Sequence, residues 1–289
     1  MTKWRWIAPL LGLLFCCRQP ETSRGGQLVV AASIAPLADF CRQVGGECVS
    51  VFTVVPAGTN PHTFELSPDH LKRLATARLL VLNGIGLEYW ADKVADNFSP
   101  AALQVVWVST GIPVLQDSDH AAGNPHVWLN PVYAMVQIEN IVQALIRVDP
   151  AHADQYRQNG NRLKAQLSAL DQHLAAEIST WQHKSFICFH PSWNYFANRY
   201  GLHQAAVIEK RPGFEPSPAD VAEVIALAKQ LHSKAIFAEQ QFPIKVSEMI
   251  AHECGATVLV LDPLGSDAKD FAYTKMLARN VAEMAKGLK

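Results

Sequence analysis

The segment spanning residues 149–181 has the sequence DPAHADQYRQNGNRLKAQLSALDQHLAAEISTW. Asp149 is a suitable N-cap, and Pro150 suits the first position of a helix. We therefore predict one helix over residues 151–181, about 45 Å long at 1.5 Å per residue, with Gly160 as its weak point. Its apolar side chains recur at spacings of three and four residues, which is the repeat of one helix face. These side chains belong to Tyr156, Leu163, Leu167, Leu170, Leu174, Ile178 and Trp181.

Short apolar runs lie on both sides of this segment. Four precede it, at residues 28–33, 49–55, 79–83 and 104–108, and four follow it, at residues 185–190, 205–208, 235–238 and 257–261. Nearly continuous apolar runs are typical of parallel strands that are buried on both faces, and helical patterns lie between them. We predict an α/β fold with two lobes, each a four-stranded parallel sheet flanked by helices, joined by one long rigid helix.

The predicted helix also sets the domain organisation. We expect an N-terminal lobe over residues 26–148, the linking helix over 149–182 and a C-terminal lobe over 183–289. A helix that joins two lobes is stiffer than a glycine-rich linker, so we expect little hinge closure. The alternative is that this segment is an ordinary helix of one lobe.

The first 25 residues have the layout of an export signal followed by a short linker. Lys3 and Arg5 precede an apolar run at residues 7–17, which is too short to span a bilayer as a helix. We therefore expect an exported protein, periplasmic or anchored outside the membrane through a lipid on Cys17, or on Cys16. The alternative is ordinary cleavage near residues 22–26.

Composition limits the classes of partner. The 289 residues are 49% hydrophobic and 18% charged, and 25 basic side chains balance 26 acidic ones. A net charge of -1 gives no basic excess for binding nucleic acid, and we expect a monomer.

Cysteine usage fits export. Export permits disulfides, so Cys41 and Cys48 could pair, whereas Cys188 lies in an apolar run and is expected in the core. No CxxC motif is present, which excludes a thiolate zinc site of the finger type.

Four side chains that can bind a metal follow predicted strands. They are His62, His126, His190 and Asp262, two from each lobe. In open α/β sheets, ligands bind beyond the carboxyl ends of the strands. Proline adjoins each of the four and restricts the backbone there. Three imidazoles and one carboxylate suit a borderline-soft divalent cation such as Zn²⁺.

Longer motifs around these residues resemble a known family. The chain is similar to the zinc- and manganese-specific solute-binding proteins of bacterial ABC importers, the ZnuA/TroA type. The resemblance lies in residues 44–46 (VGG), 56–65 (PAGTNPHTFE), 83–90 (NGIGLEYW), 124–131 (NPHVWLNP), 189–200 (FHPSWNYFANRY), 237–242 (FAEQQF) and 261–264 (LDPL).

The resemblance implies one metal ion held between two α/β lobes and handed to an ABC permease in the inner membrane. By matched position, the ligands are His62, His126, His190 and Asp262, and His190 is typical of the members that prefer zinc. Two features differ from the family. The loop at 116–124 holds only His120 where many zinc members have a histidine-rich loop, and Asn130 replaces a common Asp at a predicted helix start.

Two carboxylates and one glycine motif near these sites have open interpretations. Each of Glu65 and Glu239 either orients a ligand histidine or is part of a capped turn or a surface carboxylate. Gly84-Ile85-Gly86 lacks the third glycine of a dinucleotide fingerprint, so we expect no nucleotide.

The resulting functional hypothesis is a non-enzymatic carrier that captures Zn²⁺ for high-affinity uptake, with the same role for Mn²⁺ or Fe²⁺ as the alternative. In a different class, an exported zinc hydrolase would use His62, His126 and His190 as ligands, with Asp262 or Glu65 as general base. Neither HExxH nor a serine nucleophile elbow is present. An additional adhesin role is left open.

Overall fold

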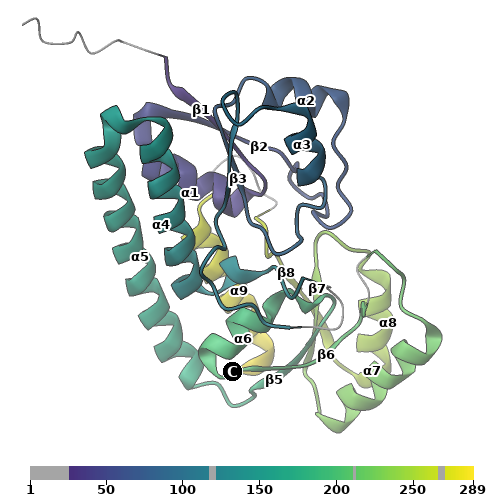
Figure 1. The fold of residues 1–289 in the computed structure, drawn as a ribbon. Coiled ribbons are helices and arrows are strands. Elements are labelled where there is room, and N and C mark those ends of the chain that lie inside the picture. The colour runs from purple at the N-terminus through teal and green to yellow at the C-terminus, as the bar shows by residue number, and fades with distance from the viewer. Residues whose placement is uncertain (1–25, 117–121, 211–212, 266–270) are drawn as a thin grey trace, which may run out of the picture.

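Two separate sheets of four parallel strands organise the computed structural model, which describes residues 26–116, 122–210, 213–265 and 271–289 (Figure 1). The N-terminal sheet has the order β2-β1-β3-β4, with β1 (Leu28–Ala32), β2 (Val49–Thr53), β3 (Leu79–Leu82) and β4 (Gln104–Trp107). The C-terminal sheet has the equivalent order β6-β5-β7-β8, with β5 (Ser185–Cys188), β6 (His203–Val207), β7 (Ala235–Glu239) and β8 (Thr257–Leu261).

The predicted fold class and the eight predicted strands are confirmed. Strands β3 and β7 are buried along their whole length, because helices cover both faces of each sheet, as expected for nearly continuous apolar runs. The export signal and the two candidate lipid-bearing cysteines lie outside the described residues.

Helices form layers on the two faces of each sheet. On the N-terminal sheet, α1 (Ala35–Gly45) and α4 (Pro131–Val148) share one hydrophobic cluster, and α2 (Pro68–Leu74) and α3 (Ala91–Asn97) share the opposite one. On the C-terminal sheet, the corresponding pairs are α6 (Asn194–Tyr200) with α9 (Tyr273–Leu288), and α7 (Pro218–Gln230) with α8 (Lys245–Cys254).

The long predicted helix is α5 (Ala153–Ser179), of 27 residues. Its start differs from the prediction, because residues 150–152 form a separate 3₁₀ turn and His152 takes the N-cap position. Asp149 does not cap the helix. Its carboxylate instead contacts His152 Nδ1 at 2.7 Å and accepts a hydrogen bond from the Tyr156 hydroxyl at 2.5 Å.

Gly160 lies where α5 packs tightly against α4. A Cβ atom at this position would lie 2.5 Å from Val142 Cγ2. The glycine that weakens the isolated helix therefore permits the close packing of the two helices.

Helix α5 runs along one side of both lobes (Figure 1) and is bonded to each. On the N-terminal side, the Asn159 amide donates to the Val44 carbonyl at 2.9 Å. On the C-terminal side, Asp171 is buried and accepts from Arg199 Nε at 2.9 Å and from the Tyr200 hydroxyl at 3.0 Å. The helix is thus both the connection between the lobes and part of their packing.

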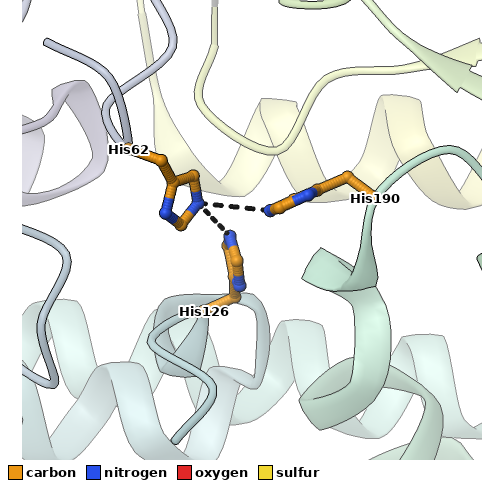
Figure 2. Close-up of side chains that lie close together, drawn as sticks. All are labelled: His62, His126 and His190. Atoms are coloured by element: carbon orange, nitrogen blue, oxygen red, sulfur yellow. Dashed lines mark hydrogen bonds between the residues drawn. The ribbon is translucent and has the colours of Figure 1, made fainter. Parts of the chain in front are cut away.

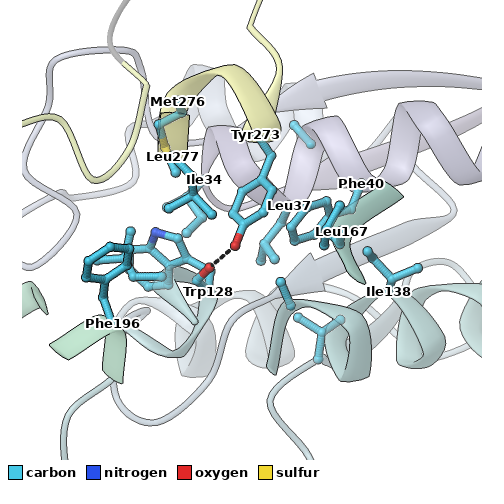
Figure 3. Packing of buried hydrophobic residues seen from close by; sticks show 14 of the residues in the cluster. Ile34, Leu37, Phe40, Trp128, Ile138, Leu167, Phe196, Tyr273, Met276 and Leu277 are labelled. Carbon is cyan, nitrogen blue, oxygen red and sulfur yellow. Dashed lines mark hydrogen bonds between the residues drawn. The ribbon is translucent and has the colours of Figure 1, made fainter. Parts of the chain in front are cut away.

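The largest hydrophobic cluster contains residues of both lobes and of α5 (Figure 3). Tyr273, at the start of α9, joins the lobes within it: its backbone N–H donates to Asp39 at 3.0 Å and its hydroxyl donates to the Trp128 carbonyl at 2.5 Å. Trp128 in turn donates its indole N–H to the Pro263 carbonyl at 2.8 Å. The two lobes therefore share one core. The predicted domain boundaries and the small hinge closure stay predictions.

Cys41 and Cys48 do not form the disulfide that their spacing permitted. Cys41 is buried in the core, whereas the Cys48 thiol lies 3.3 Å from the Gln155 side chain on α5. Cys188 is a buried core residue, as predicted. Within the described ranges, no helix combines the length and apolar character needed to cross a bilayer.

Replacing Tyr273 by phenylalanine should lower the free energy of unfolding by about 1–3 kcal/mol, because the buried Trp128 carbonyl loses a donor. Urea unfolding of the purified protein measures this change. Tyr89→Phe is the control, since 45% of Tyr89 is exposed. Equal stabilities of Y273F and Y89F would show that the hydroxyl does not hold the lobes together.

Candidate metal centre

His62 lies in the loop that follows β2. Its backbone N–H donates to the Asn60 side-chain oxygen at 2.9 Å, which closes a tight local turn. Pro61 between them is buried. The two residues beyond β2 continue the backbone pairing with β1, since Val54 and Val55 donate to Ala32 and Ser33. This loop therefore begins from a fixed strand end.

His126 lies at the end of the loop that leads into α4. The buried Asn124 side-chain oxygen accepts from the His126 backbone N–H at 3.0 Å and lies 2.9 Å from the ring Nδ1. The Asn124 amide NH₂ donates across the lobes to the Pro191 carbonyl at 2.7 Å. The Asn83 amide holds the same loop by donating to the Pro125 carbonyl at 2.9 Å. Asn130 caps α4 through Val132 N–H, as expected for a helix start.

His190 follows β5 and faces the same point from the C-terminal lobe. Its Nδ1 lies 3.0 Å from a carboxylate oxygen of Glu209, and the two side chains are only 2% and 4% exposed. The Phe242 ring lies against the imidazole, with 5.2 Å between ring centroids. The sheet of one lobe thus supplies His190, and the sheet of the other supplies His62 and His126.

The three imidazole rings converge between the lobes (Figure 2). His62 Nε2 lies 3.1 Å from His126 Nε2 and 3.2 Å from His190 Nε2. The cavity that these rings line is about 10 Å³ in volume, with Glu239, Gln241, Phe242 and Trp128 among its other walls. A tetrahedral zinc ion with Zn–N bonds of 2.0–2.1 Å places its nitrogen ligands about 3.3 Å apart. The site therefore has the spacing and the size for a single ion.

Hydrogen bonding decides which nitrogen of each ring carries the proton. The partners at Nδ1 of His126 and His190 are an amide oxygen and a carboxylate, which only accept. Each ring therefore carries a proton on Nδ1, and in the neutral ring Nε2 presents a lone pair to the cavity. A proton on His62 Nε2 could serve one of these lone pairs. A cation at the centre would satisfy all of them.

Asp262 follows β8 as predicted, and one of its oxygens is held in a local turn. One of its oxygens accepts from the backbone N–H groups of Leu264 and Gly265 at 3.1 and 2.7 Å. The same oxygen lies 3.4 Å from Gln241 Nε2, which belongs to the cavity wall. Among the described residues, the group whose ligand atoms lie within 4.8 Å of one another contains His62, His126 and His190 alone.

Glu239 lines the cavity, and its hydrogen-bond donors are Ser192 and Trp193. Its carboxylate accepts from the Ser192 hydroxyl and, at 3.1 Å, from Trp193 Nε1. Burial raises the pKa of Glu239 to about 8, and the nearby charges of Asp262 and Glu209 add to the rise. Glu65 is exposed, so it takes the other interpretation, a surface carboxylate.

Sequence reasoning missed the two residues that fix the ring tautomers. Glu209 lies two residues beyond β6, so the rule that ligands gather at strand ends could have singled out its position but not its contact with His190. Asn124 lies within a motif noted for its neighbour His126, and no sequence signal gave its role. His120 of the same loop lies outside the described residues.

The fold and this site define a two-lobed metal-binding protein with its centre between two α/β lobes. The chain belongs to the ZnuA family, zinc-uptake complex component A, periplasmic, whose family model matches residues 30–287. The resemblance inferred from the motifs is therefore confirmed.

Individual relatives agree with this assignment. The high-affinity zinc uptake system protein ZnuA of Bacillus subtilis is 29% identical over 282 residues, which cover 91% of this chain and 88% of that protein. The zinc-binding lipoprotein AdcA of Streptococcus pneumoniae is 28% identical, and the match covers 98% of this chain but 59% of AdcA. A crystal structure of ZnuA has 34% identity and a TM-score of 0.84, covering 90% of this chain and 99% of that one.

Replacing Glu239 by glutamine should flatten the dependence of stability on pH in the metal-free protein. The pKa of Glu239 is raised from 4.5 to about 8, so the folded protein holds a proton that the unfolded chain releases. This contribution is complete below about pH 4.5 and is lost as the pH rises to about 8, at roughly 1.4 kcal/mol per pKa unit.

Urea unfolding at several pH values tests this expectation. E239Q keeps an oxygen that accepts from Ser192 and Trp193, so it should match the wild type near pH 5 and exceed its stability near pH 8. The exposed Glu248→Gln is the control. Parallel pH profiles for wild type and E239Q would contradict a protonated Glu239.

Proposed function

We propose that this protein captures Zn²⁺ outside the inner membrane and delivers it to the permease of an ABC importer for high-affinity uptake. The observation that carries the proposal is the convergence of His62, His126 and His190, two of which have their lone pairs fixed toward one small cavity. Family membership and the zinc-uptake role named for the Bacillus subtilis relative support it.

Zinc is the proposed cargo because imidazole nitrogens suit a borderline-soft ion. The ring spacing fits tetrahedral zinc, and Mn²⁺ or Fe²⁺ in the same place is the alternative. We propose Asp262 as the fourth ligand. Its support is its place at the end of β8 beside Gln241, a residue of the cavity wall. The turn bonds to Leu264 and Gly265 use one carboxylate oxygen of Asp262, so ligation would use its second oxygen or require this side chain to shift.

A carrier is favoured over a hydrolase by the coordination that this set implies. Three histidines and Asp262 would close a four-coordinate shell, which leaves no position for a reactive water. A hydrolase would need a general base near that water, and Glu65, one of the two candidates, is exposed.

The remaining parts of the proposal concern location and assembly. We propose an exported protein, periplasmic or held outside the membrane by a lipid on Cys17 or Cys16, that acts as a monomer. The lipoprotein named among its relatives supports the lipid anchor. The permease is the expected protein partner.

His126→Ala should weaken zinc binding by at least about 100-fold, since loss of a ligand should exceed the 10–100-fold effect of losing an outer partner. Competition titrations with Zn²⁺, Mn²⁺ and Fe²⁺ on chelator-treated protein measure both affinity and preference. His173→Ala, on the exposed side of α5, is the control. Unchanged zinc affinity in a folded H126A protein would disprove the site.

Cobalt substitution should distinguish a carrier from a hydrolase. A closed shell of three imidazoles and a carboxylate should give an intense tetrahedral Co²⁺ spectrum that does not change when anions such as azide are added. An open catalytic site would bind the anion and change its spectrum. A strong response to azide would therefore favour the hydrolase.

A further inference from the structure

We infer that Glu209 is a positioning residue of the metal centre, which holds His190 in its metal-binding tautomer and fixes the backbone at Gly213 beside the His62 loop. The inference rests on the proposed function, because it assigns a role at the same site. Glu209 would act through His190 and Gly213 rather than as a ligand.

The backbone holds Glu209 firmly beside His190. Ile208 and Glu209 continue the pairing of β6 with β5, and the Glu209 N–H donates to the Phe189 carbonyl at 2.8 Å. The side chain is 4% exposed. A buried carboxylate is costly unless donors surround it, so its position depends on the groups that it contacts.

Both carboxylate oxygens of Glu209 face N–H groups. One lies 3.0 Å from His190 Nδ1, and the other accepts from the Gly213 backbone N–H at 3.0 Å. Only a carboxylate accepts at both ends without turning a donor toward either group. The first contact fixes the proton of His190 on Nδ1 and leaves Nε2 for the metal. A carboxylate in this position also makes the imidazole a stronger donor of electrons to the ion.

The second contact fixes a segment of the same lobe that packs against the N-terminal lobe. Gly213 has φ +81°, and a Cβ atom there would lie 3.3 Å from Thr63 Cγ2. Thr63 directly follows the ligand His62. Glu209 therefore fixes the His190 ring and, through Gly213, the chain that packs beside the His62 loop.

The tautomer of His190 in metal-free protein tests the first contact directly. Two-bond ¹H–¹⁵N NMR spectra at about pH 8.5, where free imidazole is neutral, should show the Nδ1–H form in the wild type. Glu209→Ala should populate the Nε2–H form, because Nδ1 loses its acceptor. An unchanged tautomer in E209A would overturn the inference.

Zinc affinity tests the consequence for the metal. E209Q should weaken zinc binding by about 10–100-fold, as found for outer partners of ligand histidines, and E209Q added to H190A should cost less than about twofold more. Glu223→Gln, an exposed carboxylate of the same lobe, is the control. Thermal unfolding of each metal-free variant identifies any that do not fold. The glutamine of E209Q keeps the size and shape of the Glu209 side chain, whereas E209A removes most of it.

The outcomes separate this inference from the proposed function. Normal zinc affinity in E209Q, with H126A still defective, would overturn the role of Glu209 and leave the metal site intact. Normal zinc affinity in both E209Q and H126A would contradict the proposed metal site itself. A loss in E209Q that is equally large in the H190A background would show that Glu209 does not act through His190.

Discussion

Opposed lone pairs are the constraint on which this structure depends. His126 and His190 are held by acceptors at Nδ1, so in the neutral rings both Nε2 lone pairs face one cavity. Such an arrangement is unfavourable in an empty site and favourable around a cation. It persists only if the surrounding protein prevents the rings from turning away. The buried contacts of Asn124 and Glu209 provide that resistance, and both are anchored in regular structure or across the lobe interface.

Fixed rings require fixed lobes, and the packing between the lobes meets this need. The main hydrophobic cluster crosses the interface, and Tyr273 and Trp128 add buried hydrogen bonds within it. Helix α5 is bonded to α1 on one side and to α6 on the other. Relative motion of the lobes would break buried polar contacts as well as apolar packing. The shared core thus explains how loops from two sheets can define a cavity sized for one ion.

The elements were predictable from sequence because their signals are local. The eight apolar runs, the repeat in α5 and the histidines in the loops that follow strands need only neighbouring residues to be recognised. These histidines are His62, His126 and His190. Three features were not accessible in this way. The true start of α5 depends on Asp149 reaching Tyr156, the roles of Asn124 and Glu209 depend on contacts between distant segments, and the orientation of Asp262 depends on its own turn.

The residue types at positions 124 and 209 follow from the groups that face them. Asn124 meets the donors of His126 at one end and the Pro191 carbonyl at the other, so it must both accept and donate, which an amide does and a carboxylate cannot. Glu209 meets donors at both ends, His190 Nδ1–H and Gly213 N–H, so it must accept twice. A carboxylate at position 124 would place an acceptor against the Pro191 carbonyl. An amide at position 209 would turn a donor toward either the His190 ring or the Gly213 N–H. The two histidine tautomers are therefore set by complementary chemistry, and one of the two groups also bonds the lobes together next to His190.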